Sequence, residues 1–347
     1  MKKQILILLF LVLVVIVGIG VYKNAKPTTS TTNDVTEQLG STGIPSIDNL
    51  TAQITKNTSD ATLFAARAKA FYENEGYDNA IQDMAMAMKI DSTNADYHHQ
   101  LSEIYLDYYK SRLALRTMER CVSLHPRRIK SLLYLAEIQQ ILKQYDASMA
   151  TITRVMSIEP DNPEGFYMIG LNHILMGNKT MAIKNLQKTV DLNPDHSDAW
   201  TLLGNIFKED NNPLAEQYFE NAIESSPGDL DVLFNKASYL HNNDRLNEAA
   251  RILKRIIKAD KNYVDAYQSL GIIYIEKDSM QKAYENFNIA VNVNPQFGLG
   301  YYYRAYTSEN LGNFKAAKAD YQNVLNFQPD FERAKEGMAR VDAALAN

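Results

Sequence analysis

The feature that most constrains this chain is a small residue that returns at a nearly fixed interval. The interval is 34 residues, and it shortens to 33 only once. The residue is alanine everywhere except for one serine, and the positions are Ala80, Ala114, Ser148, Ala182, Ala215, Ala249, Ala283 and Ala317. A period of this length predicts a stacked array of similar supersecondary structures.

Two further columns keep the same register. A second small residue lies twelve positions earlier, or eleven in the short repeat, at Ala68, Ser102, Ala136, Gly170, Gly204, Ala237, Gly271 and Ala305. Twelve positions later a proline stands in six of eight repeats, at Pro126, Pro160, Pro194, Pro227, Pro295 and Pro329. Three columns in one register make an accidental period untenable.

Each repeat predicts two antiparallel helices of about 13 residues. In residues 163–196, Phe166 and Ile169 have helical spacing, and Gly177 breaks the first helix. Pro194 ends the second, because the residue before a proline avoids the helical region. Small residues let the helix axes approach closely. Neither helix can bury its apolar face alone, so the repeats must stack.

The run WTLLGNIF at residues 200–207, followed by Ala215, Phe219, Ala222 and Pro227, resembles the tetratricopeptide repeat family. The resemblance implies an all-α, right-handed superhelical solenoid over residues 61–331. Its eight repeats are 61–94, 95–128, 129–162, 163–196, 197–229, 230–263, 264–297 and 298–331. We expect the short fifth repeat to lack one residue in the turn between its helices. Residues 332–347 predict a C-terminal capping helix.

The amino terminus predicts a membrane anchor. Ile5–Tyr22 is an uninterrupted apolar run of 18 residues, which reaches the length of a membrane-spanning helix. We therefore expect residues 1–23 to form a single transmembrane helix, with a cleaved secretory signal as the alternative. Lys2 and Lys3 favour an amino terminus on the inner side. The repeats would then lie on the periplasmic or outer side of a bacterial inner membrane, with a cytoplasmic array as the alternative.

Residues 24–60 join this segment to the repeats. Their first part is rich in Thr, Ser and Asn, which predicts a polar flexible linker. Ile47, Leu50 and Ile54 behind Ser46 hint at a short helix over residues 46–57. The sequence does not decide between that helix and a continued linker.

Charge and motif content argue against several functions. The formal net charge is −5, so we expect no nucleic-acid partner, which would require a basic surface. The one cysteine, Cys121, fills a small-residue column and predicts packing. Glycine-rich phosphate loops and metal-ligand spacings are absent from the sequence, so we predict a non-enzymatic protein without catalytic residues, cofactor or metal.

The resemblance implies that first helices line a concave groove. Apolar, aromatic and amide residues at groove positions are candidate partner contacts, because exposed clusters of this kind mark interaction sites. They are Tyr134, Tyr167, Met168, Leu171, Asn205, Phe234, Asn235, Tyr302, Tyr303 and Tyr306. Packing within the repeats is the alternative for each. Asn205 and Asn235 match two positions of a carboxylate clamp, but its basic positions are not filled.

These observations predict a membrane-tethered scaffold that binds a partner protein or peptide in its groove, within the bacterial cell envelope. Tethering would raise the local concentration of that partner. The alternative is a structural or assembly spacer that acts through self-association or end contacts. The sequence leaves homo-oligomerisation open.

Overall fold

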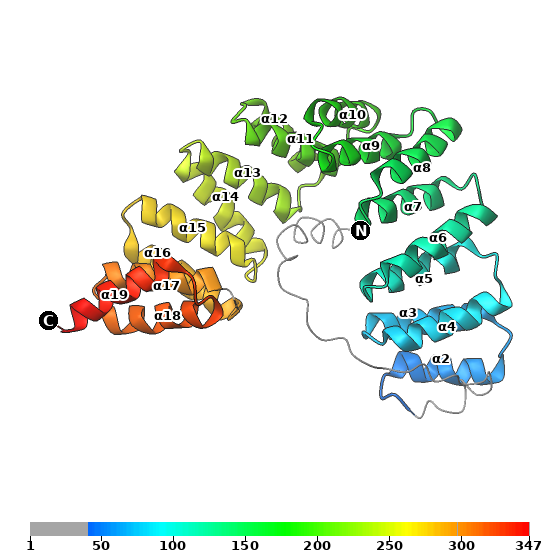
Figure 1. Ribbon diagram of the computed structural model, residues 1–347, viewed down its shortest axis with the longest axis horizontal. Helices are drawn as coiled ribbons and strands as arrows, with labels where there is room; N and C mark the ends of the chain where they lie inside the picture. The colour runs from blue at the N-terminus through cyan, green and yellow to red at the C-terminus, as the bar shows by residue number, and fades with distance from the viewer. Residues whose placement is uncertain (1–40, 297, 347) are drawn as a thin grey trace. The chain divides into compact units, whose positions relative to one another are not determined.

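A computed structural model of the chain describes residues 41–296 and 298–346 (Figure 1). Its regular elements over this range are 18 α-helices, α2 to α19. The chain divides into two compact units, an N-terminal unit that ends at Asn178 and a C-terminal unit that begins at Lys179. The prediction of an all-α helical repeat array is confirmed.

The N-terminal unit contains α2 (Pro45–Lys56), α3 (Ala61–Glu73), α4 (Tyr77–Ile90), α5 (Ala95–Asp107), α6 (Ser111–Leu124), α7 (Ile129–Ile141), α8 (Tyr145–Ile158) and α9 (Pro163–Leu175). The C-terminal unit contains α10 (Lys179–Leu192), α11 (Ser197–Glu209), α12 (Leu214–Ser225), α13 (Leu230–Asn242), α14 (Leu246–Ala259), α15 (Val264–Glu276), α16 (Met280–Val293), α17 (Gly298–Asn310), α18 (Phe314–Phe327) and α19 (Glu332–Ala346). Odd-numbered helices from α3 to α17 are first helices of the repeats, and even-numbered helices from α4 to α18 are second helices. Repeat positions are counted from 1 at residues 61, 95, 129, 163, 197, 230, 264 and 298.

Polar side chains start several first helices. Asp60 accepts a hydrogen bond from the backbone N–H of Thr62 at 2.9 Å, and Asn162 accepts one from Gly165 at 2.8 Å. Asn94 and Asp229 cap α5 and α13 in the same way. These caps satisfy N–H groups that have no partner inside a helix. Asn162 and Asp229 each lie two residues after a proline of the column, Pro160 and Pro227, so there one short segment ends a repeat and begins the next.

The turn between the two helices has one geometry in all eight repeats. The residue at position 15 has a positive φ, and the next N–H bonds back to the carbonyl at position 11, as in Lys110 to Tyr105 at 2.7 Å. This is a helix-ending motif that usually employs glycine. Only Gly177 and Gly312 provide one, and six larger residues, such as Tyr109 with φ 58°, adopt the left-handed conformation.

The short fifth repeat differs from the sequence prediction. Its inter-helix turn is intact, because Asn211 has φ 50° and the N–H of Asn212 bonds to the carbonyl of Phe207. The missing residue lies instead at the start of α12, which is preceded by Pro213 and has 12 residues where α14 has 14. A shorter helix keeps the turn geometry, which is fixed by backbone hydrogen bonds.

The recurrent small residues lie where helices touch. All eight residues of the 34-residue column are fully buried. At position 8, a Cβ added to Gly204 would lie 2.6 Å from the ring of Phe219, and one added to Gly271 would lie 2.6 Å from that of Phe287. Absence of a side chain on the first helix therefore makes room for a ring from the second.

Helices also cover the two ends of the described repeats. The predicted short helix is present as α2, which packs on α3 with Ile47 and Ile54 fully buried. α19 packs on α18 through Ala334 and Val341. The predicted anchor at residues 1–23 lies outside the described residues. Among the helices that the structure does describe, none combines the length and apolar character needed to cross a membrane.

Candidate functional site

First helices form the closely spaced side of each array. Within the N-terminal unit α3 lies against α5 and α7 against α9, and within the C-terminal unit α11 lies against α13 and α13 against α15. Second helices make no comparable contact with the next second helix in the described range. Side chains on neighbouring first helices can therefore act together on one ligand.

In the N-terminal unit this side gathers carboxylates and tyrosines. The set is Tyr72 on α3, Glu103 and Asp107 on α5, and Tyr134 and Glu137 on α7, and we call it the acidic face. Tyr72 donates a hydrogen bond from its hydroxyl to Asp107. Burial raises the pKa of Tyr134, and the charges of Glu137 and Glu103 raise it further. Tyr72 and Tyr134 thus each interact with Glu103 and Asp107, which lie on the helix between them.

Glu137 is the most constrained carboxylate of the acidic face. Its side chain is half-buried, and this burial raises its pKa, with a further contribution from the charge of Glu103. Within the described residues no lysine or arginine forms an ion pair with Glu103, Asp107 or Glu137. The site therefore holds negative charge that no lysine or arginine of the described residues neutralises by an ion pair, and a cation would stabilise it.

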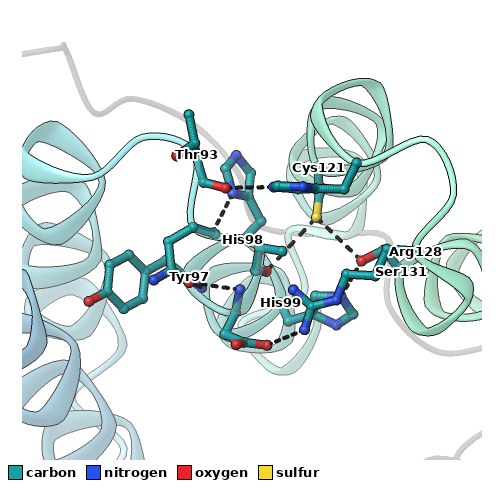
Figure 2. Close-up of polar contacts among 11 residues, drawn as sticks. Thr93, Tyr97, His98, His99, Cys121, Arg128 and Ser131 are labelled. Atoms are coloured by element: carbon teal, nitrogen blue, oxygen red, sulfur yellow. Dashed lines mark hydrogen bonds and ion pairs between the residues drawn. The ribbon is translucent and has the colours of Figure 1, made fainter.

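The neighbouring His99 belongs to the packing between α5 and α7. Its ring stacks on Tyr134 with centroids 5.1 Å apart, and its Nε2 is hydrogen-bonded to Ser131 Oγ at 2.9 Å. Ser131 also contacts Cys121 Sγ at 3.6 Å (Figure 2). Burial, with the positive charges of Arg128 and Lys130, lowers the pKa of His99 to about 4. His99 is therefore neutral at pH 7 and holds one side of Tyr134.

Of the predicted groove residues on α9, two are more buried than expected. Tyr167 and Met168 are each only 7% exposed, whereas Leu171 is half-buried. The backbone carbonyl of Met168 accepts a hydrogen bond from Gln140 Nε2 at 3.0 Å, which joins α9 to α7. Of these three, Leu171 presents the largest accessible fraction to a partner.

In the C-terminal unit, Asn205 lies on α11, and Phe234 and Asn235 lie on the neighbouring α13. Asn205 Oδ1 is buried without a hydrogen-bond partner in the described chain. The ring of Phe234 packs against Tyr263 with centroids 5.7 Å apart. Phe234 therefore contributes to helix packing as well as to the first-helix side.

The predicted tyrosines of α17 are held by aromatic packing. Tyr302 lies 5.1 Å from the ring of Phe331, and Tyr303 stacks on Phe287 at 5.1 Å. Tyr306 is half-buried as well. Packing accounts for much of the Tyr302 and Tyr303 surface, so Tyr306 is the member of the three that no described ring covers.

Sequence reasoning placed Glu137 at a groove position of the third repeat but missed Glu103 and Asp107 of the acidic face. The predicted groove contacts include only apolar, aromatic and amide residues. Glu103 and Asp107, at positions 9 and 13 of the second repeat, are carboxylates and were therefore left out. The repeat register could have placed them on the first-helix side, because it assigns every residue to a position in its repeat. The described residues contain no group of three His, Cys, Asp or Glu side chains able to hold a metal ion.

Comparisons with known proteins connect this array to a family. Models of the tetratricopeptide repeat match residues 167–229, 207–271 and 300–331. In the solved hetero-tetramer Cut9-Hcn1 of APC/C, one chain matches 85% of this chain and 58% of its own length, with a TM-score of 0.54 and 13% identity. A tetratricopeptide repeat protein from Parabacteroides merdae matches 71% of this chain and 98% of its own length, with a TM-score of 0.50 and 16% identity.

Curated relatives are distant. A DnaJ homolog subfamily C member 7 homolog of Dictyostelium discoideum is 21% identical and covers 77% of this chain and 49% of its own length. The Hsp70-Hsp90 organizing protein of Triticum aestivum is 20% identical, with 65% and 40% covered. The type IV pilus assembly protein PilF of Pseudomonas aeruginosa is 23% identical, with 38% and 53% covered. The chain spans about half the length of these relatives. Residues 167–271 and 300–331 match tetratricopeptide repeats, and the helix pairs observed there agree with that architecture.

Proposed function

We propose that the repeats bind a partner protein on their first-helix side, and that in the N-terminal unit the bound segment carries lysine or arginine. The observation that supports this most is the acidic face, where Glu103, Asp107 and Glu137 lie together without a cation from the described chain. A basic side chain of the partner would relieve the cost of ionising Glu137.

The tyrosines of the acidic face suit the same partner. Tyr72 and Tyr134 are half-buried, and His99 stacks on the ring of Tyr134. Tyrosine offers a large contact area at low conformational cost, and its ring face attracts lysine and arginine. Negative charge and ring faces side by side favour a basic segment over an acidic one.

Two of the relatives are named for a role with other proteins. One is the Hsp70-Hsp90 organizing protein, and the other is the type IV pilus assembly protein PilF. These names support a protein-binding role without identifying the partner. The function proposed is therefore that of a non-catalytic scaffold.

The scaffold is tethered to a bacterial cytoplasmic membrane by residues 1–23, with the repeats on the outer side. The 18-residue apolar run Ile5–Tyr22 supports the tether, and Lys2 and Lys3 support the orientation. Extraction of membranes with alkaline carbonate tests the tether, because an anchored chain stays in the pellet. Protease added to intact spheroplasts should digest the repeats, and full protection would place them on the inner side.

The binding test compares two variants of equal charge change. Glu103→Gln/Glu137→Gln removes charge from the acidic face, whereas Glu119→Gln/Asp146→Asn removes it from the exposed surface of second helices. The probe is a fluorescein-labelled peptide of alternating Lys, Tyr and Gly, titrated against the full chain. We expect roughly a tenfold weaker affinity for the first variant and little change for the second. Equal effects would mean that only net charge attracts the peptide.

Self-association is a second candidate, favoured by exposed apolar side chains on the last three helices. Leu299 is 46% exposed, Phe327 56% and Leu345 41%. Sedimentation equilibrium of the full chain distinguishes the two functions. A dimer that Phe327→Glu dissociates would support an assembly role, whereas a monomer at micromolar concentration would exclude it.

A further inference from the structure

A basic pocket is lined by residues of α14 and α15 in the C-terminal unit, none of which is a predicted groove residue. Its volume is about 270 Å³, and its walls include Arg251 and Lys254 from α14, Tyr274 from α15 and Lys277, the residue that follows α15. Pockets that enclose a whole drug-sized ligand usually exceed about 300 Å³. The space therefore suits a single small group better than a large molecule.

The ring of Tyr274 is the centre of this cluster. Lys254 Nζ lies 5.8 Å from its centroid, and Lys282 Nζ from α16 lies 5.7 Å from it. Lys277 Nζ donates a hydrogen bond to Asn247 Oδ1, which holds this ammonium beside the pocket. Lys254 and Lys282 thus flank the ring, and Arg251 and Lys277 line the adjoining pocket, in a chain whose net charge is −5.

The cations are only partly compensated within the described residues, since the pKa of Glu248 is lowered first by its hydrogen bond from Arg245 and also by the charge of Arg251. Arg251, Lys254, Lys277 and Lys282 form no ion pair with any described carboxylate. Glu248, on the same helix as Arg251, is already engaged by Arg245 in two hydrogen bonds of 2.7 and 2.8 Å. Gathering like charges raises the free energy of the empty pocket, and an anion would offset that cost.

The cluster is peculiar to this junction and not a property of the repeat. It uses positions 18, 21, 22 and 25 of one second helix and positions 14 and 19 of the next repeat. At the α6–α7 junction these positions hold two cations, Arg112 and Arg116, together with Glu119. At the α18–α19 junction they hold Lys315 and Lys318, and at the remaining junctions they hold at most one. The repeat fold therefore does not require four cations here.

We propose that this pocket binds a phosphate monoester. The phosphate oxygens would meet Arg251, Lys254 and Lys277, because guanidinium and ammonium groups form charge-assisted hydrogen bonds with such oxygens. The organic part of the ester would rest on the face of Tyr274. The site is separate from the acidic face, so this assignment does not depend on the proposed partner binding.

The test is a ³¹P NMR titration of the full chain with phenyl phosphate and with inorganic phosphate. We expect saturable broadening of the phosphate resonance, and about a tenfold rise in Kd for each cation removed in Lys254→Gln and Arg251→Gln. The matched control is Arg112→Gln/Arg116→Gln, at equivalent positions on α6, which should bind as the parent does. Circular dichroism checks that each variant is folded.

The two probes separate the sources of the phosphate. Tighter binding of phenyl phosphate, lost in Tyr274→Leu, assigns the pocket to an organic ester as proposed. Equal binding of both probes would assign it to free phosphate and overturn the ester. No saturable binding up to about 10 mM, or equal loss in the α6 control, would overturn the site itself.

Discussion

In the N-terminal unit, positions 8 and 24 of the first repeat hold Ala68 and Met84, whereas the same positions in the repeat at residues 264–297 hold Gly271 and Phe287. All four residues are buried. An alanine on the first helix paired with a methionine on the second fills the same space as a glycine paired with a phenylalanine ring. The repeat register therefore fixes the spacing of the helices, whereas the residue types that fill the core can differ from repeat to repeat.

Polar groups inside the two units differ as well. The N-terminal unit buries Arg67 with Asp83, and Thr151 with Gln139, each joined by hydrogen bonds of 2.7 to 2.8 Å. In the C-terminal unit the equivalent pair Arg304–Asp320 retains 17% and 8% side-chain exposure. The N-terminal unit thus depends on specific polar pairs, and the C-terminal unit depends more on ring packing.

The largest expected effect is loss of the buried pair. Asp83→Ala leaves Arg67, which has no exposed side-chain surface, without its carboxylate, and should cost about 3–5 kcal/mol of unfolding free energy. Asp320→Ala should cost less, about 1.5–3 kcal/mol, because Arg304 can still reach water. Urea denaturation of both variants gives the comparison. Equal losses would show that burial does not distinguish the two pairs.

A second change tests the ring packing of the C-terminal unit. Gly271→Ala places a Cβ against Phe287 and should destabilise the chain by about 1–3 kcal/mol. Gly228→Ala is the control, since nothing lies within 4 Å of its added Cβ. Adding Phe287→Leu to Gly271→Ala recreates the combination of Ala237 with Leu253 and should recover part of the loss. A double variant as unstable as the single would contradict this account.

The third prediction concerns pH and the N-terminal unit alone. The pKa of His99 is lowered to about 4 in the folded chain, against about 6.5 when unfolded. Between these values the unfolded chain binds a proton that the folded chain does not, so stability falls as pH is lowered from about 6.5 to 4. His99→Gln should flatten the dependence of urea midpoint on pH in this range. An unchanged slope would mean that His99 is not held neutral.

The smallest effect tests a feature that both units share. Tyr109 is 95% exposed and has φ 58°, so Tyr109→Gly should relieve backbone strain and stabilise the chain by about 1 kcal/mol. Tyr109→Ala keeps a Cβ and should change little. Asn211→Gly in the C-terminal unit should gain less, because asparagine tolerates this conformation. Thermal unfolding measures all three, and a destabilised Tyr109→Gly would show that the ring has an unrecognised contact.

Much of the fold could be predicted from the register alone. The fully buried Ala80 and its seven equivalents were found as a column, because stacking requires a small residue at the same place in every repeat. The left-handed turns were not found, because only Gly177 and Gly312 give a sequence signal there. At Tyr109 the backbone hydrogen bonds of the turn impose the conformation against the preference of the residue.

The candidate site was predictable only in part. Register placed Tyr134 on the first-helix side, but it could not show that Tyr303 stacks on Phe287 of another helix. The ring of Tyr274 lies near both Lys254 and Lys282, which are 28 residues apart on two helices, so no local run of charge in the sequence predicts this cluster. Side-chain contacts between helices carry this information, and spacing along the chain does not.

The central claim is that the acidic face of the N-terminal unit receives a basic segment of a partner protein. The most direct measurement is photo-crosslinking in the cells that express the chain, from a photoreactive residue at Leu133 on α7 and, in parallel, at Asp146 on α8. We predict that position 133 crosslinks to one or a few proteins at peptides rich in lysine or arginine, and that position 146 does not. Crosslinks of equal yield from both positions, or to acidic peptides, would contradict the claim.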